Sequence, residues 1–131
     1  MTRRERFRAA LGSLEAFCAE PIENDRDVAG ILQGFAFTFE LAWKVIQDET
    51  ERRGYTEKGP RLSFAAGFRA GVVPAEDADT WSDALEDRNM VAHTYRPDGA
   101  RDLAERIGDQ YLPAFERLVT RLDEAAAEPV P

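Results

Sequence analysis

The chain has 131 residues, of which 44% are hydrophobic and 32% are charged, and its formal net charge is −8. This length and composition are typical of one globular domain and exclude a disordered or fibrous chain. The negative charge argues against a broadly basic surface built to bind nucleic acid, and we expect no DNA partner.

Apolar residues at spacings of three and four predict the first two helices. The first covers residues about 3–19 and is closed by Pro21. The second starts near Asp25 or Asp27, either of which suits an N-cap, and runs to Arg53. The residues expected to face the core are Phe7, Leu11, Leu14 and Phe17 or Cys18 in the first helix, and Ile31, Leu32, Phe35, Phe39, Ala42, Trp43 and Ile46 in the second.

The next two helices are predicted mainly from their end signals. Pro60 suits the first turn of a short third helix, which Gly71 ends. Asp77 or Asp79 caps a fourth helix, which ends before Pro97.

A fifth helix is expected after Asp98, with Pro113 inside it as the cause of a kink. Its inward residues are predicted to be Leu103, Ile107, Tyr111, Phe115, Leu118 and Leu122. No alternating strand pattern and no internal repeat is present. We therefore predict an all-α fold, an up-down bundle of four to five helices, with one domain over residues 1–126 and a frayed tail over 127–131.

The N-terminal segment has scattered arginines and no unbroken apolar run, so it does not resemble a signal peptide. No stretch approaches the roughly 20 apolar residues of a membrane span. The single cysteine cannot form an internal disulfide, which fits a reducing compartment. We expect a cytoplasmic protein with no membrane partner.

The stretch "LEDRNMVAHTY", residues 85–95, contains the only histidine of the chain. Arg88 interrupts an apolar stripe of the fourth helix, so its guanidinium must be paired or must face a cleft or a second subunit. Asn89 and His93 are four residues apart and share the adjacent face. The members of the stripe are Trp81, Leu85, Arg88, Ala92 and Tyr95.

These side chains suit cleavage of RNA. The imidazole of His93 can transfer a proton near neutral pH, and Arg88 can bind phosphate oxygens. RNA supplies its own nucleophile, the 2′-hydroxyl, so we expect no metal and no cofactor. A plainer interpretation stays open: Arg88 pairs with Asp87, Glu86 or Asp83, and His93 only favours the helix C-terminus.

Two other segments carry candidate functional residues. "GFAFTFELAW", residues 34–43, is interpreted as core or dimer seam rather than as a platform for stacking bases. Within it, Glu40 is either the partner of an arginine or a half-buried surface acid. A locally basic segment supplies five candidate RNA-phosphate contacts, which are Arg52, Arg53, Lys58, Arg61 and Arg69.

Three stretches in order, at residues 37–44, 59–73 and 81–95, resemble the HepT-type branch of the HEPN superfamily, and most of all its nucleotidyltransferase substrate-binding subgroup. They read "FTFELAWK", "GPRLSFAAGFRAGVV" and "WSDALEDRNMVAHTY". The last contains the R-N-x-x-x-H pattern of HEPN ribonucleases, followed by x-Y.

The resemblance implies a helical homodimer in which two such motifs meet across a cleft. It implies that Arg88 and His93 form the catalytic pair, that Asn89 supports them, and that an MNT-type nucleotidyltransferase antitoxin adenylylates Tyr95. The expected function is therefore a metal-independent endoribonuclease toxin. The alternative is a non-catalytic substrate-binding subunit of a nucleotidyltransferase. In the implied dimer we expect the stripe with Arg88 to face the second subunit, so that the fourth helix forms part of the dimer seam.

Overall fold

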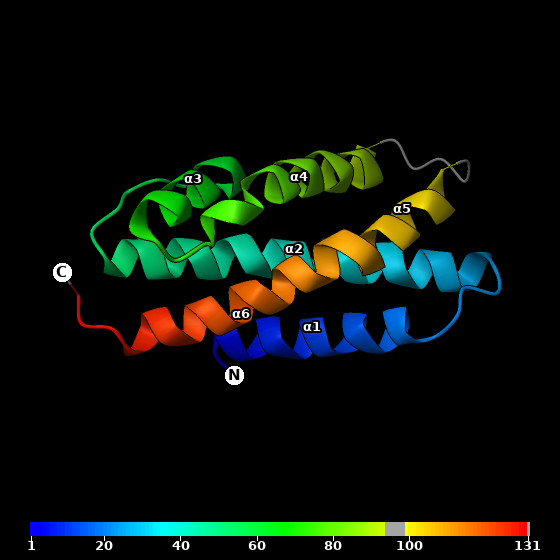
Figure 1. Ribbon diagram of the computed structural model, residues 1–131, viewed down its shortest axis with the longest axis horizontal. Coiled ribbons are helices and arrows are strands. Elements are labelled where there is room, and N and C mark those ends of the chain that lie inside the picture. The colour runs from blue at the N-terminus through cyan, green and yellow to red at the C-terminus, as the bar shows by residue number, and fades with distance from the viewer. Residues whose placement is uncertain (94–98, 131) are drawn as a thin grey trace.

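The computed structural model describes residues 1–93 and 99–130, except for the side chains of Ala92 and His93. This part of the chain is an all-α bundle without strands, as predicted (Figure 1). Its helices are α1 (Arg3–Ala19), α2 (Asp25–Arg52), α3 (Pro60–Ala70), α4 (Ala78–His93), α5 (Ala100–Arg106) and α6 (Leu112–Ala127), with a 3₁₀ turn η1 (Ala75–Asp77) and a π-helical segment η2 (Ile107–Tyr111).

Helix α2 lies at the centre of the bundle and packs against α1, α3, α4, α5 and α6. Helix α1 runs beside it, while α3 and α4 lie along another side (Figure 1). This position explains why α2 is apolar over such a wide arc. The buried residues that were predicted correctly are Ile31, Leu32, Phe35, Phe39, Ala42 and Ile46. Trp43 was also expected in the core, but it is only partly buried.

The segment from α5 through η2 to α6 is helical without a break. All six predicted inward residues of this segment are buried, from Leu103 at 5% exposure to Leu122 at 3%. Where Pro113 was expected to kink the helix, the backbone widens into η2, which ends at Tyr111, two residues before the proline. A proline lacks the N–H of a regular helical turn and its ring crowds the carbonyl four residues earlier, so a wider turn accommodates it.

The helix ends follow the predicted boundaries closely, but the cap of α2 differs. The side chain of Asn24 caps α2 by accepting from the amide of Asp27 at 3.0 Å, so neither aspartate predicted for this role is the cap. Asp77 is buried in η1 and accepts two hydrogen bonds from Arg117, at 3.0 and 2.8 Å. Gly71 ends α3 in the left-handed conformation, as predicted (φ 74°). Asp98, expected before the last helix, lies outside the described residues.

None of the described helices combines the length and the apolar character needed to cross a membrane.

Candidate functional site

Helix α4, which carries the R-N-x-x-x-H pattern, is held by the core of its own protomer. The indole of Trp81 stacks on Phe64 at 4.9 Å between ring centroids and meets Phe115 edge-on at 5.2 Å. Trp81 and Leu85 are 2% and 6% exposed. The expectation that this stripe faces a second subunit is therefore wrong for these two residues, because both are buried in the core of their own protomer.

Arg88 lies where the stripe leaves the core. Its Nη2 donates to Oε2 of Glu40 on α2 at 2.9 Å, and Glu40 is also 3.7 Å from the ammonium of Lys44. Of the partners considered from the sequence, Glu40 is the one used, and the nearby acids of α4 are not. The side chains of Arg88 and Glu40 are 30% and 34% exposed, so a solute can reach both.

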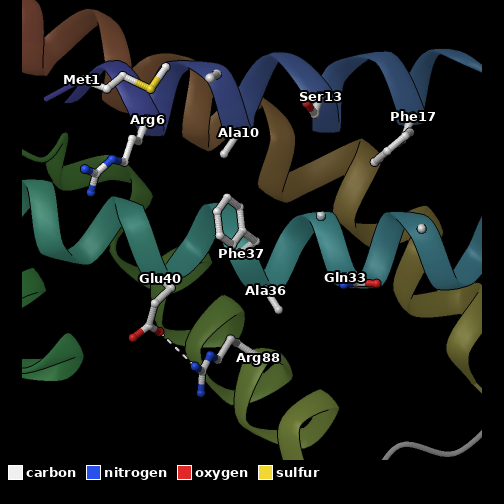
Figure 2. A pocket seen from close by; sticks show the side chains of 13 residues that line it. Met1, Arg6, Ala10, Ser13, Phe17, Gln33, Ala36, Phe37, Glu40 and Arg88 are labelled. Carbon is white, nitrogen blue, oxygen red and sulfur yellow. Dashed lines mark hydrogen bonds and ion pairs between the residues drawn. The ribbon is translucent and has the colours of Figure 1, made fainter. Parts of the chain in front are cut away.

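A groove of about 920 Å³ opens between α1 and α2 and ends at this ion pair (Figure 2). Figure 2 shows Phe37 projecting into the gap between the two helices, with Glu40 and Arg88 meeting below it. Small residues form much of the floor of this groove. The groove is lined by Met1, Arg6, Ala9, Ala10, Ser13, Phe17, Gly30, Gln33, Gly34, Ala36, Phe37, Glu40 and Arg88.

A second, smaller hollow of about 120 Å³ also includes Glu40 and Arg88. It brings Asn89, which is exposed on α4, beside Trp43 of α2. Arg88 therefore borders two hollows with different linings. The smaller one is lined by Phe39, Glu40, Trp43, Pro60, Leu85, Arg88 and Asn89.

His93 is the last residue of α4, one helical turn beyond Asn89. Its side chain and the whole of Tyr95 lie outside the described residues. The structure thus brings Arg88 and Asn89 together at one hollow, while the placements of the histidine and tyrosine side chains remain predictions from the motif.

Asp87, the neighbour of Arg88, belongs to a buried cluster that the sequence did not reveal. It is 8% exposed and accepts hydrogen bonds from Nε and Nη2 of Arg106, at 3.1 and 3.0 Å, and from the hydroxyl of Tyr111. Burial raises the pKa of Tyr111, and the hydrogen bond to Asp87 raises it further, so the phenol stays a donor. The cluster ties α4 to α5 and η2.

This cluster also changes the local charge around the motif. The carboxylate of Asp87 is paired with a guanidinium rather than free at the surface. A buried carboxylate paired in this way repels an approaching phosphate much less than an exposed one. The acidic pair "ED" that precedes Arg88 in the sequence therefore contributes mainly Glu86, which is exposed.

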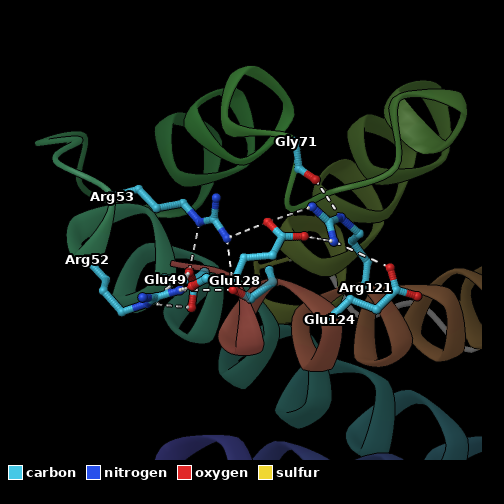
Figure 3. Close-up of polar contacts among 8 residues, drawn as sticks. Glu49, Arg52, Arg53, Gly71, Arg121, Glu124 and Glu128 are labelled. Atoms are coloured by element: carbon cyan, nitrogen blue, oxygen red, sulfur yellow. Dashed lines mark hydrogen bonds and ion pairs between the residues drawn. The ribbon is translucent and has the colours of Figure 1, made fainter. Parts of the chain in front are cut away.

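Four of the five basic residues proposed as RNA-phosphate contacts pair with carboxylates. Arg52 and Arg53 both pair with Glu49. Both also donate to the carbonyl of Ala125, at 2.9 and 2.8 Å, and so connect the end of α2 to the end of α6 (Figure 3). Glu128 also belongs to this connection. Hydrogen bonds lower the pKa of its carboxyl group, the one from Arg121 most and the one from Arg53 next.

The remaining members of the basic segment lie at the surface. Lys58 pairs with Glu51, Arg69 pairs with Glu57, and Arg61 is exposed on α3. Arg52 lies twelve residues beyond Glu40 on α2, which corresponds to about 18 Å along the helix axis. RNA contacts to these residues stay a prediction, and such contacts would compete with ion pairs already formed.

The described part of the chain contains no group of three or more His, Cys, Asp or Glu side chains placed to hold a metal ion. What it does present is a half-exposed guanidinium next to an exposed amide. A guanidinium has five N–H donors, and among the described residues Arg88 uses one of them, on Glu40. Within this part of the chain, donors are therefore left over for the oxygens of an anion such as phosphate.

Comparison with protein families gives a match over most of the chain. The model of the family described as "Nucleotidyltransferase substrate binding protein like" matches residues 2–124. No curated protein matches the chain.

Proposed function

The chain belongs to the nucleotidyltransferase substrate-binding-like family, and we propose that it is a metal-independent endoribonuclease toxin that a partner nucleotidyltransferase silences. The observation that carries the proposal is the position of Arg88. Its guanidinium is half-exposed at the meeting point of two hollows, with Asn89 beside it and the backbone of His93 one turn further along α4.

In the proposed reaction His93 removes the proton from the 2′-hydroxyl of RNA. The oxygen attacks the adjacent phosphorus, the bond from phosphorus to the 5′-oxygen breaks, and that oxygen takes up a proton. The products are a 2′,3′-cyclic phosphate and a 5′-hydroxyl. Arg88 stabilises the negative charge that builds on the phosphorane oxygens, and Asn89 orients the reacting groups.

The proposed enzyme is a homodimer, with a site composed of two motifs that face each other across the twofold axis. The surface that supports this is the groove between α1 and α2 rather than the buried stripe of α4. Phe37 and Phe17 are 61% and 48% exposed there. Large apolar side chains gathered in one groove are typical of a protein interface, and this groove leads directly to Arg88.

The variant Phe37→Glu is expected to be a monomer at micromolar concentration, because dimerisation would bury an unpaired carboxylate. Light scattering or sedimentation measures this. Leu62→Glu is the matched control: Leu62 is 53% exposed on α3, outside the groove, and its replacement should leave the dimer intact. A monomeric wild-type protein, or equal behaviour of the two variants, would contradict the proposed seam.

The family description points to association with a nucleotidyltransferase. We propose an MNT-type antitoxin as this partner and Tyr95 as the residue that it adenylylates. Tyr95 stands two residues after His93, so an added nucleotide would bring bulk and negative charge to the mouth of the site.

The second candidate function is a binding subunit without chemistry of its own, which docks on a nucleotidyltransferase and presents its substrate. The family description favours it, and so does the net charge of −8.

Growth of bacteria that express the chain separates the two functions. We expect the wild-type chain to stop growth when it is expressed alone. Cells should grow when they express His93→Ala, or when they express the wild-type chain together with the partner. Normal growth with wild type alone, at a level of folded protein equal to that of His93→Ala, would favour the binding subunit.

A further inference from the structure

The smaller hollow beside Arg88 has the size and the lining of a site for one flat ring. Its volume of about 120 Å³ lies well below the roughly 300–1,000 Å³ of sites that enclose a whole ligand. A single planar group fits it, while the rest of a larger ligand would remain outside.

We propose that this hollow binds one nucleobase of the RNA chain whose phosphate Arg88 holds, with the base stacked on Trp43. This inference rests on the proposed ribonuclease function and adds to it a determinant of base preference. The indole of Trp43 borders the hollow and is only partly buried, unlike Phe35 and Phe39 on the same helix. A large aromatic ring at the surface, next to a phosphate-binding arginine, is the usual platform for a base of single-stranded RNA.

The remaining walls fit the same ligand. Phe39, Pro60 and Leu85 supply apolar contacts, while the amide of Asn89 can both donate to and accept from the edge of a base. The ammonium of Lys44 lies 5.6 Å from the ring centroid of Trp43. Lys44 and Arg88 both pair with Glu40, so two cations and one carboxylate lie at this edge of the hollow and favour an RNA phosphate there.

The test measures binding of short oligoribonucleotides to His93→Ala protein, in which cleavage is blocked. One series carries a single abasic nucleotide at successive positions. At one position, loss of the base is expected to weaken binding about 5-fold to 150-fold, the range for one base stacked on an aromatic side chain. In Trp43→Leu the same abasic change should weaken binding much less, and in Trp43→Phe it should weaken binding nearly as much as in the protein with Trp43.

Tyr55→Leu is a matched control. Tyr55 is also a partly buried aromatic residue with a cation 5.6 Å from its ring centroid, in this case Arg69, but it lies outside the hollow. Its replacement should leave the penalty for the abasic change intact. The indole N–H resonance of Trp43 gives a second readout in the His93→Ala protein. This resonance should shift when intact RNA binds, and should not shift with RNA that lacks the base at the position where its loss weakens binding.

The outcomes separate this inference from the function on which it rests. If Arg88→Ala does not weaken RNA binding, the proposed ribonuclease site is wrong, and the base site falls with it. If Arg88→Ala weakens binding while Trp43→Leu keeps the full penalty for the abasic change, or the Trp43 resonance does not respond to the base, the base site alone is wrong.

Discussion

Replacing His93 with alanine is expected to slow RNA cleavage about 100-fold or more, because a positioned general base contributes typically 10²–10⁴-fold. Arg88→Ala should cause a similar loss, since removal of one group that stabilises a developing oxyanion costs about 10²–10³-fold. Both losses should be seen with EDTA present, because the proposed reaction uses no metal. Single-turnover cleavage of a labelled RNA measures the rates.

Neither His93→Ala nor Arg88→Ala should lose cleavage activity because the protein unfolds. The pair between Arg88 and Glu40 is about one-third exposed on each side, so breaking it should cost at most about 1 kcal/mol. Thermal melting by circular dichroism checks this. Arg101→Ala is the matched control, since Arg101 is an exposed arginine of α5 paired with Glu105 at 3.4 Å. Full cleavage by His93→Ala would remove the proposed general base.

Incubation with the partner nucleotidyltransferase, Mg²⁺ and ATP is expected to raise the mass of the chain by one or more adenylyl groups and to stop cleavage. A free phenol has a pKa near 10 and is a poor nucleophile at neutral pH, so the partner must activate Tyr95. Its oxygen then attacks the α-phosphorus of ATP and releases pyrophosphate. The new phosphodiester would sit beside the site as a fixed anion and repel RNA.

Tyr95→Phe should abolish the mass gain and leave cleavage active in the presence of the partner. The other two tyrosines provide the comparison. Tyr111 is fully buried and donates to Asp87, so its hydroxyl is not available, whereas Tyr55→Phe should keep the gain. A gain that persists in Tyr95→Phe would place the modification on another residue. An unchanged mass with a partner of demonstrated activity would leave simple occlusion as the mode of silencing.

Local signals in the sequence were sufficient to predict the helices. Apolar spacing located the six large inward residues of the last helical segment, from Leu103 to Leu122, because a helix that packs on one side must repeat its apolar residues with its own period. Pro60 and Gly71 set the ends of α3 through backbone restrictions that need no tertiary context.

Contacts between helices were not predictable in the same way. The spacing of Trp81, Leu85 and Arg88 shows that they share one face, but not whether that face meets its own protomer or a second one. The side of α4 that holds Trp81 meets α3 and α6, while Arg88 meets Glu40, forty-eight residues earlier. Whether two residues far apart in the sequence meet depends on how the helices pack, and a single sequence does not specify that packing.

In the candidate site, too, features within one helix were predictable and contacts between helices were not. The pattern of Arg88, Asn89 and His93 was visible in the sequence because these residues lie within two turns of one helix. Trp43 was assigned to the core because it continues the apolar stripe of α2, yet α3 and α4 leave it half-covered beside Arg88. Likewise, Asp87 was considered as a partner of its neighbour Arg88, whereas its partners are Arg106 and Tyr111, about twenty residues further along the chain.

The most direct measurement is the chemical identity of the ends that the purified dimer leaves on a defined RNA in EDTA. The proposed mechanism predicts a 2′,3′-cyclic phosphate on one fragment and a 5′-hydroxyl on the other, with neither formed by His93→Ala. Intact RNA after incubation with folded, dimeric wild-type protein, or the same ends formed at the same rate by His93→Ala, would contradict a ribonuclease site at Arg88 and His93.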